Sequence, residues 1–180
     1  MVLRHLVTSL RKFRNWHHWI GISVVAFLFI TAITGVFLGW KKNVAVLQPP
    51  TLRGGDAPYA DWISFEQVIA VSAHAIDSVT GRALDLDRMD VRPERALVKV
   101  TFQEYWEVQV DLATGNIFSV AQRHADWIEH IHDGSIISDG FKLLYTNYIG
   151  VGLLFLCITG FWLWYGPRII RKEKHRQEKF

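Results

Sequence analysis

Two long hydrophobic stretches interrupt an otherwise mixed pattern of polar and apolar residues along this chain. Neither stretch, Trp19 to Trp40 or Tyr148 to Gly166, contains a Lys, Arg, His, Asp or Glu. Each is close to the roughly 20 residues that a helix needs to cross a bilayer at 1.5 Å per residue. The pattern therefore predicts two transmembrane helices joined by a polar middle segment.

The polar middle has its own periodicities. Ser64 and Gln67 have the spacing of a capping box, apolar residues follow at helical intervals, and Gly81 is a typical stop signal. Beyond Gly81 the period changes to two, with strands expected over 98–102, 105–110 and 117–120 and a turn at 103–104. This predicts one helix followed by a short antiparallel sheet. Prolines and glycines between Gln48 and Tyr59 indicate a linker before it.

The fold class expected from these patterns is an α+β membrane protein, a two-transmembrane-helix hairpin with a small extracytoplasmic domain. The first apolar run is longer than a signal-peptide core and no small-residue cleavage site follows it, so we expect a retained anchor. The expected segments are a basic tail (1–15), a first transmembrane helix (16–41), a linker (42–62), the domain (63–122), a juxtamembrane segment (123–140), a second transmembrane helix (141–166) and a basic tail (167–180).

Charge gives the hairpin a direction. Each terminal tail has a net charge of +4, whereas residues 41–147 hold ten Lys or Arg against fifteen Asp or Glu, a net charge of −5. Lys and Arg accumulate on the cytoplasmic side of membrane proteins. We therefore expect a bacterial inner-membrane protein with both tails cytoplasmic and the middle domain periplasmic. The basic balance reflects this topology, and no nucleic-acid partner is expected.

Small residues mark one face of the first apolar run. Thr31, Gly35 and Gly39 recur every four residues, and the two glycines form a GxxxG pattern that favours close helix packing in lipid. This face could seat the second helix of the same chain, which we slightly favour. It could equally seat a second copy in a homodimer or another membrane subunit. The lipid bilayer itself is the remaining partner of both helices.

Histidines stand just outside both apolar runs and are the candidate ligands. His17 and His18 precede the first run, and His130 and His132 precede the second. A neutral imidazole is a common axial ligand of haem iron and of other metals. The sequence has no P-loop or dinucleotide fingerprint, and its one cysteine, Cys157, lies in an apolar run far from any histidine. Whether the chain is an enzyme stays open, but any chemistry would be electron transfer.

Several motifs resemble one family of membrane proteins. Residues 64–120, with S-F-E-Q-V at the start and D-L-A-T-G-N-I-F at the end, resemble a PepSY domain. R-K-F-R-N-W-H-H-W-I-G at 11–21 is similar to the H-R-W-L-G-L opening of PepSY-associated transmembrane proteins, which places His17 at the family histidine. I-H-D-G at 131–134 resembles that family's L-H-x-G, and I-T-G occurs in both apolar runs, at 33–35 and 158–160.

This resemblance implies a role in iron uptake. Larger relatives have about four membrane helices, and some reduce ferric siderophores with haem b bound between the helices. By resemblance His17 and His132 are the first choices as haem b and metal ligands, followed by His130 and His18. With two helices this chain lacks the four-helix cage of those relatives, so a complete site for the cofactor is not expected within one copy.

Topology restricts how these histidines could be used. His17 and His132 lie near opposite membrane faces, about 30 Å apart, so they cannot bind the same iron within one chain. A haem could be shared through His17 of two copies, or lie near the outer face on His130 or His132 with a ligand from a partner. Alternatively the histidines only mark the membrane interface. A non-haem metal in the cluster 124–133 is a third interpretation, although His130 and His132 would point about 200° apart on a helix.

Two functions therefore remain open. The first is a haem-binding electron-transfer subunit that reduces a periplasmic acceptor such as a ferric chelate. The second is a non-catalytic anchored module, for binding or assembly, whose periplasmic domain docks a partner protein. PepSY domains also occur in protease propeptides with a proposed inhibitory role, so the resemblance is consistent with both.

Overall fold

The computed structural model describes residues 2–177, and the chain divides into two compact units. One unit, here called the helical unit, contains the residues up to Thr34 and those from His130 onward. The other, here called the sheet unit, spans Gly35–Glu129. The helical unit thus joins segments from the two ends of the sequence, whereas the sheet unit is one continuous stretch.

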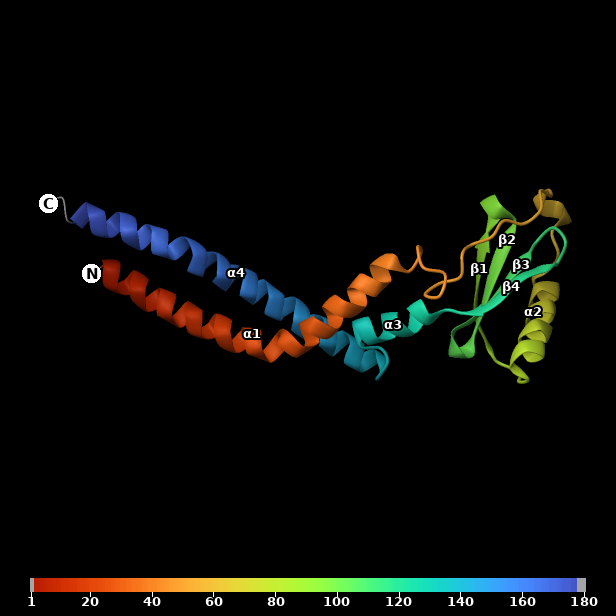
Figure 1. Cartoon of the computed structure of the whole chain (residues 1–180), viewed down its shortest axis with the longest axis horizontal. Helices are drawn as coiled ribbons and strands as arrows, with labels where there is room; N and C mark the ends of the chain where they lie inside the picture. Colours follow the sequence, from red (N-terminus) through yellow and green to blue (C-terminus); the bar gives the residue numbers. More distant parts are fainter. Residues whose placement is uncertain (1, 178–180) are drawn as a thin grey trace. The chain divides into compact units, whose positions relative to one another are not determined.

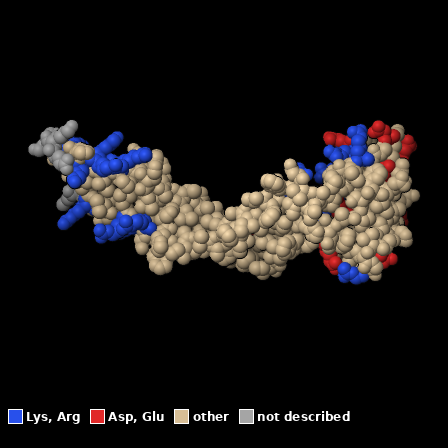
Figure 2. All heavy atoms as spheres, viewed as in Figure 1, with Lys and Arg blue, Asp and Glu red and all other residues tan. Residues whose placement is uncertain are grey.

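Two 39-residue helices, α1 (Val2–Trp40) and α4 (Asp139–Gln177), build most of the helical unit. They run side by side in opposite directions, so the N- and C-terminal ends of the chain lie at the same end of the pair (Figure 1). Lys and Arg gather at that end, and the adjoining section of the pair shows neither blue nor red (Figure 2). Both helices are long and apolar enough to cross a membrane.

The apolar side chains of these helices mostly point outward. Only 11 % of the most apolar window of α1 and 22 % of that of α4 is buried within the structure. Phe29 and Leu154, for example, are 66 % and 65 % exposed. A core helix of a soluble protein would bury most of this surface, so these helices require an apolar surrounding.

The two helices meet along a seam with a seven-residue repeat. Successive seam positions are seven residues apart on each helix, and they rise along α1 as they fall along α4. This is the spacing of left-handed coiled-coil packing. In chain order of α1, the facing pairs are Leu10 and Gly166, His17 and Thr159, Val24 and Gly152, and Thr31 and Tyr145.

Glycines of α4 allow the close approach at two of these levels. A Cβ added at Gly152 would lie 2.8 Å from Val24 Cγ1, and one added at Gly166 would lie 2.6 Å from Leu10 Cδ2. A Cβ added at Gly39 would meet no atom within 4 Å. The glycines that seat the partner helix are therefore on α4, and Gly39 of the predicted GxxxG face does not serve this purpose within the chain.

The sheet unit contains α2 (Phe65–Thr80) and four antiparallel strands in the order β1-β2-β3-β4. The strands are β1 (Leu86–Arg92), β2 (Leu97–Phe102), β3 (Trp106–Asp111) and β4 (Ile117–Gln122). Short 3-10 turns lie at Tyr59–Asp61, Pro93–Arg95 and Gln103–Tyr105, and a further helix, α3 (His124–Asp133), precedes α4.

Local signals explain where α2 begins and ends. The Ser64 hydroxyl accepts a bond from the Gln67 backbone N–H at 3.2 Å, and Gln67 Oε1 accepts one from the Ser64 N–H at 3.0 Å. Gly81 ends the helix with φ of 68°, a left-handed conformation that glycine adopts without steric cost. The capping box and the stop signal expected from the sequence are both confirmed.

The core of the sheet unit lies between α2 and one face of the sheet, the face that the helix covers in Figure 1. Val68 and Ile76 of α2 pack with Val100 and Val108 of the central strands, and all four are fully buried. The opposite face of the central strands is polar and also buried. Its members are Lys99, Thr101, Glu107, Gln109 and Asp111.

The linker after α1 covers that polar face. The Leu52 N–H donates to Gln109 Oε1 at 3.0 Å, and Gln109 Nε2 donates to the Pro50 carbonyl at 2.9 Å. The linker thus replaces water over the centre of the sheet and satisfies a buried amide. The sequence predicted the linker but did not indicate that it would pack on the sheet.

Candidate functional site

His17 lies on the seam between the two long helices. Its Nδ1 is 2.7 Å from Oγ1 of Thr159, the residue that faces it on α4. Gly160 follows Thr159, and a Cβ added there would lie 3.5 Å from His17 Cε1. The imidazole is therefore held between α1 and the Thr159–Gly160 step of the second I-T-G motif.

The Thr159 hydroxyl favours the His17 tautomer with its proton on Nδ1. Thr159 Oγ1 donates to the Phe155 carbonyl at 2.7 Å, one turn earlier on α4. A hydroxyl has a single proton, so toward His17 its oxygen acts as the acceptor and Nδ1–H is the donor. In the neutral ring Nε2 then carries no proton and keeps its lone pair. A nitrogen in this state can bind a metal.

His132 repeats this arrangement near the other end of the helical unit. It lies near the end of α3, and its Nδ1 is 2.9 Å from Oγ1 of Thr34 on α1. Thr34 Oγ1 donates to the Ile30 carbonyl at 2.7 Å, so it too accepts from the imidazole. Thr34 belongs to the first I-T-G motif. Both motifs thus fix a histidine supplied by another helix.

Helix geometry places the two histidines at different levels. His17 and Thr34 are both on α1, and at 1.5 Å per residue they are about 25 Å apart along its axis. His132 lies at the level of Thr34 because it is bonded to it. One copy of the chain therefore brings one of the two favoured histidines to each level.

A cavity of about 410 Å³ opens beside His17 on the surface of the helix pair. Gly21 leaves room in its wall, since a Cβ there would touch only Leu156, at 3.8 Å. Apart from the two imidazoles, the lining side chains are aliphatic. The lining residues are His17, His18, Gly21, Ile22, Val25, Leu28 and Leu156.

The two remaining predicted ligands have their own neighbours. His18 borders the same cavity and packs edge-on against Trp19, with ring centroids 5.5 Å apart. His130 Nδ1 is bonded to Ser135 Oγ. His130 and His132 both belong to α3, which is helical as the geometric argument assumed. Among residues 2–177, no group of three or more His, Cys, Asp or Glu is arranged to hold a metal ion.

The corner between α3 and α4 keeps His132 in place. Gly134 has φ of 79°, and a Cβ there would lie 3.1 Å from the Tyr145 ring. Asp133 accepts bonds from the Ser135 N–H at 2.9 Å and pairs with Lys142 at 2.6 Å. Desolvation alone would raise the pKa of Asp133, but the bonds to Lys142 and Ser135 outweigh it and lower the pKa to about 2. The I-H-D-G motif is thus a histidine followed by a hydrogen-bonded turn.

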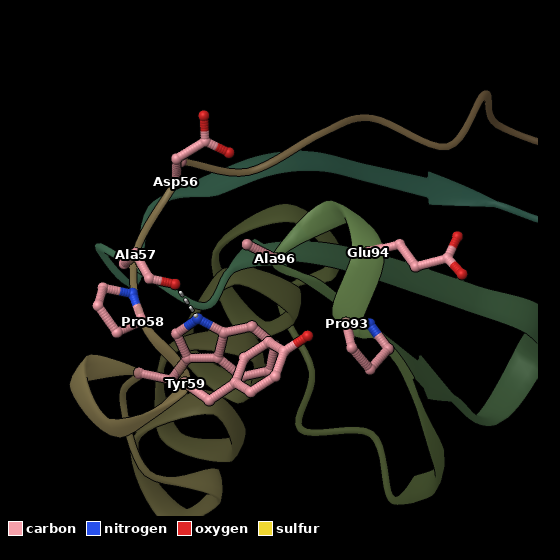
Figure 3. Close-up of a pocket in the computed structure, with 9 residues that line it drawn as sticks. Asp56, Ala57, Pro58, Tyr59, Pro93, Glu94 and Ala96 are labelled. Atoms are coloured by element: carbon pink, nitrogen blue, oxygen red, sulfur yellow. Dashed lines mark hydrogen bonds between the residues drawn. The ribbon is translucent and has the colours of Figure 1, made fainter.

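A separate cavity of about 330 Å³ lies in the sheet unit (Figure 3). Tyr59 and Trp62 meet edge to face at 4.7 Å, and Trp62 Nε1 donates to the Ala57 carbonyl at 3.3 Å. The Asp56 and Glu94 carboxylates point away from the aromatic pair (Figure 3). The cavity is therefore an aromatic and proline surface from which both lining carboxylates point away.

The sequence did not indicate the roles of Thr34, Thr159, Asp133 and Gly134. The repeated I-T-G was visible as a pattern, but its meaning depends on which residues face it across the helix pair.

Comparison with known proteins gave one result. A family model described as PepSY-associated TM region matches residues 14–180. None of the curated proteins compared with the chain matches it.

Proposed function

The chain belongs to the PepSY-associated TM region family and is a membrane protein, and we propose that it is a haem b-binding electron-transfer subunit. Its location would be the bacterial inner membrane, with both basic tails in the cytoplasm and the PepSY domain in the periplasm. The electron acceptor would be a periplasmic ferric chelate such as a ferric siderophore. Haem supplies reversible one-electron chemistry when it is bound.

The observation that carries this proposal is the pair of histidine–threonine bonds. Each threonine hydroxyl donates to a backbone carbonyl, so its oxygen is placed to accept from Nδ1–H of the histidine and to leave Nε2 available as a ligand. Metal-binding histidines commonly donate their second ring N–H to a neighbouring acceptor, which fixes the ring and its tautomer. His17 and His132 fit this requirement, and the apolar cavity beside His17 offers a surface for one face of a macrocycle.

One copy would supply one axial ligand at each level. The second ligand would come from His17 of a second copy, from His18 or His130 of a neighbouring chain, or from another membrane subunit. The Gly35 and Gly39 face of α1 is the surface we assign to such a neighbour, because a Cβ at Gly39 would have no contact within 4 Å among the residues that the structure describes. Two haems on different levels would then connect the two sides of the membrane.

Absorption spectroscopy of the full-length protein, purified in detergent from haem-replete cells, tests the proposal. We expect a Soret band that weakens in His17→Ala and in His132→Ala and is lost in the double variant. His74→Ala is the matched control, because His74 is exposed on α2 in the sheet unit. A colourless wild-type protein, or a band that survives in the double variant, would overturn the haem assignment.

The threonines provide a finer test of the ligand geometry. Thr159→Val keeps the shape but removes the acceptor for His17 Nδ1–H, whereas Thr159→Ser keeps it. Loss of such a supporting acceptor typically weakens metal binding about 10- to 100-fold. We expect a weaker haem affinity and a shifted reduction potential in Thr159→Val, and values near wild type in Thr159→Ser. Equal behaviour of the two variants would contradict the positioning role.

The aromatic cavity of the sheet unit favours the alternative, a non-catalytic module that docks a periplasmic protein. Tyr59 is 72 % exposed beside Trp62, and exposed aromatic side chains are enriched at protein interfaces. Photo-crosslinking from position 59 of the full-length protein in intact cells should trap a defined partner. A crosslinked partner together with a colourless protein would favour this module over the redox subunit.

A further inference from the structure

A second cavity of the sheet unit is lined by basic side chains. It has a volume of about 410 Å³ and lies between the segment after α1 and strands β1 and β2. Asp90 is the one acidic residue in its wall. The basic residues of the wall are Lys42, Arg92, Arg95, Lys99 and Arg123. This concentration of positive charge contrasts with the net negative charge of the middle of the chain.

Lys99 is the buried residue of this group. It lies on β2 with an exposed fraction of 2 %, and its Nζ is 3.1 Å from Glu107 Oε1. An ammonium group has three N–H donors. Among the described residues, Glu107 is the one acceptor within hydrogen-bonding distance of Lys99 Nζ. Lys99 therefore brings donors to the cavity that the described part of the protein does not use.

The nearby carboxylates do not balance the basic wall. Glu107 is shared, because it also accepts from Arg123 Nη1 at 3.0 Å and from Gln109 Nε2 at 2.9 Å. Asp126 is shared as well, because it pairs with Arg123 at 3.0 Å and with Arg88 at 3.5 Å. Asp90 is paired with Arg92 at 2.6 Å. Arg95 donates to the neutral Thr51 carbonyl at 2.7 Å and has no carboxylate partner among the described residues. The cavity thus retains an excess of positive charge.

Fold stability gives little reason for this arrangement. Replacing a buried ion pair with packed apolar residues is often neutral or stabilising, so the burial of Lys99 with Glu107 is weak evidence for a role in stability. Positive groups that converge on a partly enclosed cavity raise its potential and attract anions. Arginine forks match the oxygen geometry of phosphate, and lysine adds a point charge to it.

We propose that this basic cavity binds a phosphate-bearing anion through Arg95, Lys99 and Arg123. Phosphate oxygens would accept from the unused donors of Lys99 and from the guanidinium groups. Two sources share this chemistry, a soluble phosphate compound and the headgroup of an anionic phospholipid. The site is separate from the proposed haem ligands and does not depend on them, so the two proposals can fail independently.

Calorimetric titration of the full-length protein with pyrophosphate, at constant sodium chloride concentration, tests the site. The protein is held in phosphatidylcholine nanodiscs, and the heat signal requires no haem. We expect saturable binding that is at least about 10-fold weaker in Arg95→Gln, because a charge-assisted bond to the phosphate is lost. Lys99→Met should weaken it similarly. Arg95 is exposed, so its variant remains informative if Lys99→Met fails to fold.

Arg82→Gln is the matched control. It removes the same charge from an exposed arginine of the sheet unit that pairs with Glu104, away from the cavity wall. We expect less than a 2-fold change in this variant. Equal weakening in Arg82→Gln and Arg95→Gln would overturn the proposal. So would the absence of saturable pyrophosphate binding both in phosphatidylcholine nanodiscs and in nanodiscs that also contain phosphatidylglycerol.

Nanodiscs that contain phosphatidylglycerol distinguish the two sources. If the lipid headgroup occupies the cavity, pyrophosphate should bind more weakly in these discs than in phosphatidylcholine discs, and Arg95→Gln should remove that difference. Equal binding in both discs would support a soluble phosphate compound. Both results support a phosphate site and assign its source.

Discussion

The sheet unit and the helical unit are packed by different means. Between α2 and the sheet, branched aliphatic side chains such as Ile76, Val100 and Val108 are fully buried. Between α1 and α4, glycines allow the backbones to approach and hydroxyl groups bond across the helices. Burial of apolar surface stabilises a domain in water, but lipid is as apolar as the side chains, so helices in a membrane associate through close fit and hydrogen bonds.

The comparison extends to buried polar groups. The sheet unit buries Lys99 and Glu107, an ion pair surrounded by further charged groups. The membrane section of the seam uses neutral partners instead, a histidine with a threonine and a tyrosine with a threonine. Charges are costly in lipid, whereas neutral donors and acceptors that are paired can be kept there. The solvent around each unit therefore decides which polar groups its interior uses.

The largest effect is expected in the core of the sheet unit. Ile76→Ala removes a fully buried side chain from α2 and should lower the free energy of unfolding by about 2–5 kcal/mol. Denaturation of the full-length protein, followed by far-UV circular dichroism, measures it. Val79→Ala is the control on the same helix, because Val79 is 56 % exposed, and it should change the value by less than about 0.5 kcal/mol. Similar losses in both variants would contradict the assigned core.

A smaller effect is expected in the seam of the helical unit. Gly152→Ala places a Cβ 2.8 Å from Val24 Cγ1, and such overpacking typically costs about 1–3 kcal/mol. Unfolding in mixed micelles measures the loss of stability. Adding Val24→Ala should restore most of it, because the obstructing methyl groups are then gone.

Gly150→Ala is the control for the seam. A Cβ at Gly150 would meet nothing within 4 Å, and alanine favours helix, so this variant should be neutral or slightly stabilising. If Gly150→Ala destabilised the protein as much as Gly152→Ala, or Val24→Ala gave no rescue, the seam as described would be wrong.

The smallest effect on stability is expected on acidification, and it involves one carboxylate from each unit. The pKa of Asp133 falls from 3.8 to about 2, and the pKa of Asp111 is lowered by bonds from Thr114, Ala113 and Gly55 that outweigh its desolvation. A lowered pKa in the folded state stabilises the fold at neutral pH. For Asp133 this contribution is lost as the pH falls from about 4 to about 2.

Asp133→Asn should remove the contribution of the helical unit to this acid dependence. At pH 7 it should lower the free energy of unfolding by less than about 1 kcal/mol. Stability measured between pH 7 and pH 2.5 should fall less steeply in Asp133→Asn than in wild type. Asp56→Asn is the control, because the Asp56 side chain is 94 % exposed. An unchanged slope in Asp133→Asn would show that the pair with Lys142 does not contribute.

Elements with strong local signals could be predicted from the sequence. The helix after Ser64 has a capping box, a helical period and a glycine stop, and α2 follows these signals. Alternating residues gave the positions of β2, β3 and β4, and two charge-free runs gave the long helices. In each case neighbouring residues carry the information.

Elements that depend on distant partners could not be predicted. The edge strand β1 (L-D-R-M-D-V-R) carries four charged residues, and only its pairing with β2 reveals it. The sequence identified His17 and His132 by resemblance, but not the threonines that hold them, because those bonds join residues 142 and 98 positions apart. The GxxxG pattern on α1 was a local signal, whereas the glycines that seat the helix, Gly152 and Gly166, lie fourteen residues apart on α4, two steps of the seam repeat.

The seven-residue seam also limits how the length of the helix pair can change. Inserting one residue into α1 would rotate everything beyond it by about 100° and turn half of the seam toward lipid. Insertions that keep the seven-residue repeat unchanged add seven residues to each of the two helices. One such step adds about 10 Å, a third of a bilayer core of about 30 Å. The levels at which His17 and His132 are held are therefore set in coarse increments, and the bilayer leaves little room for another.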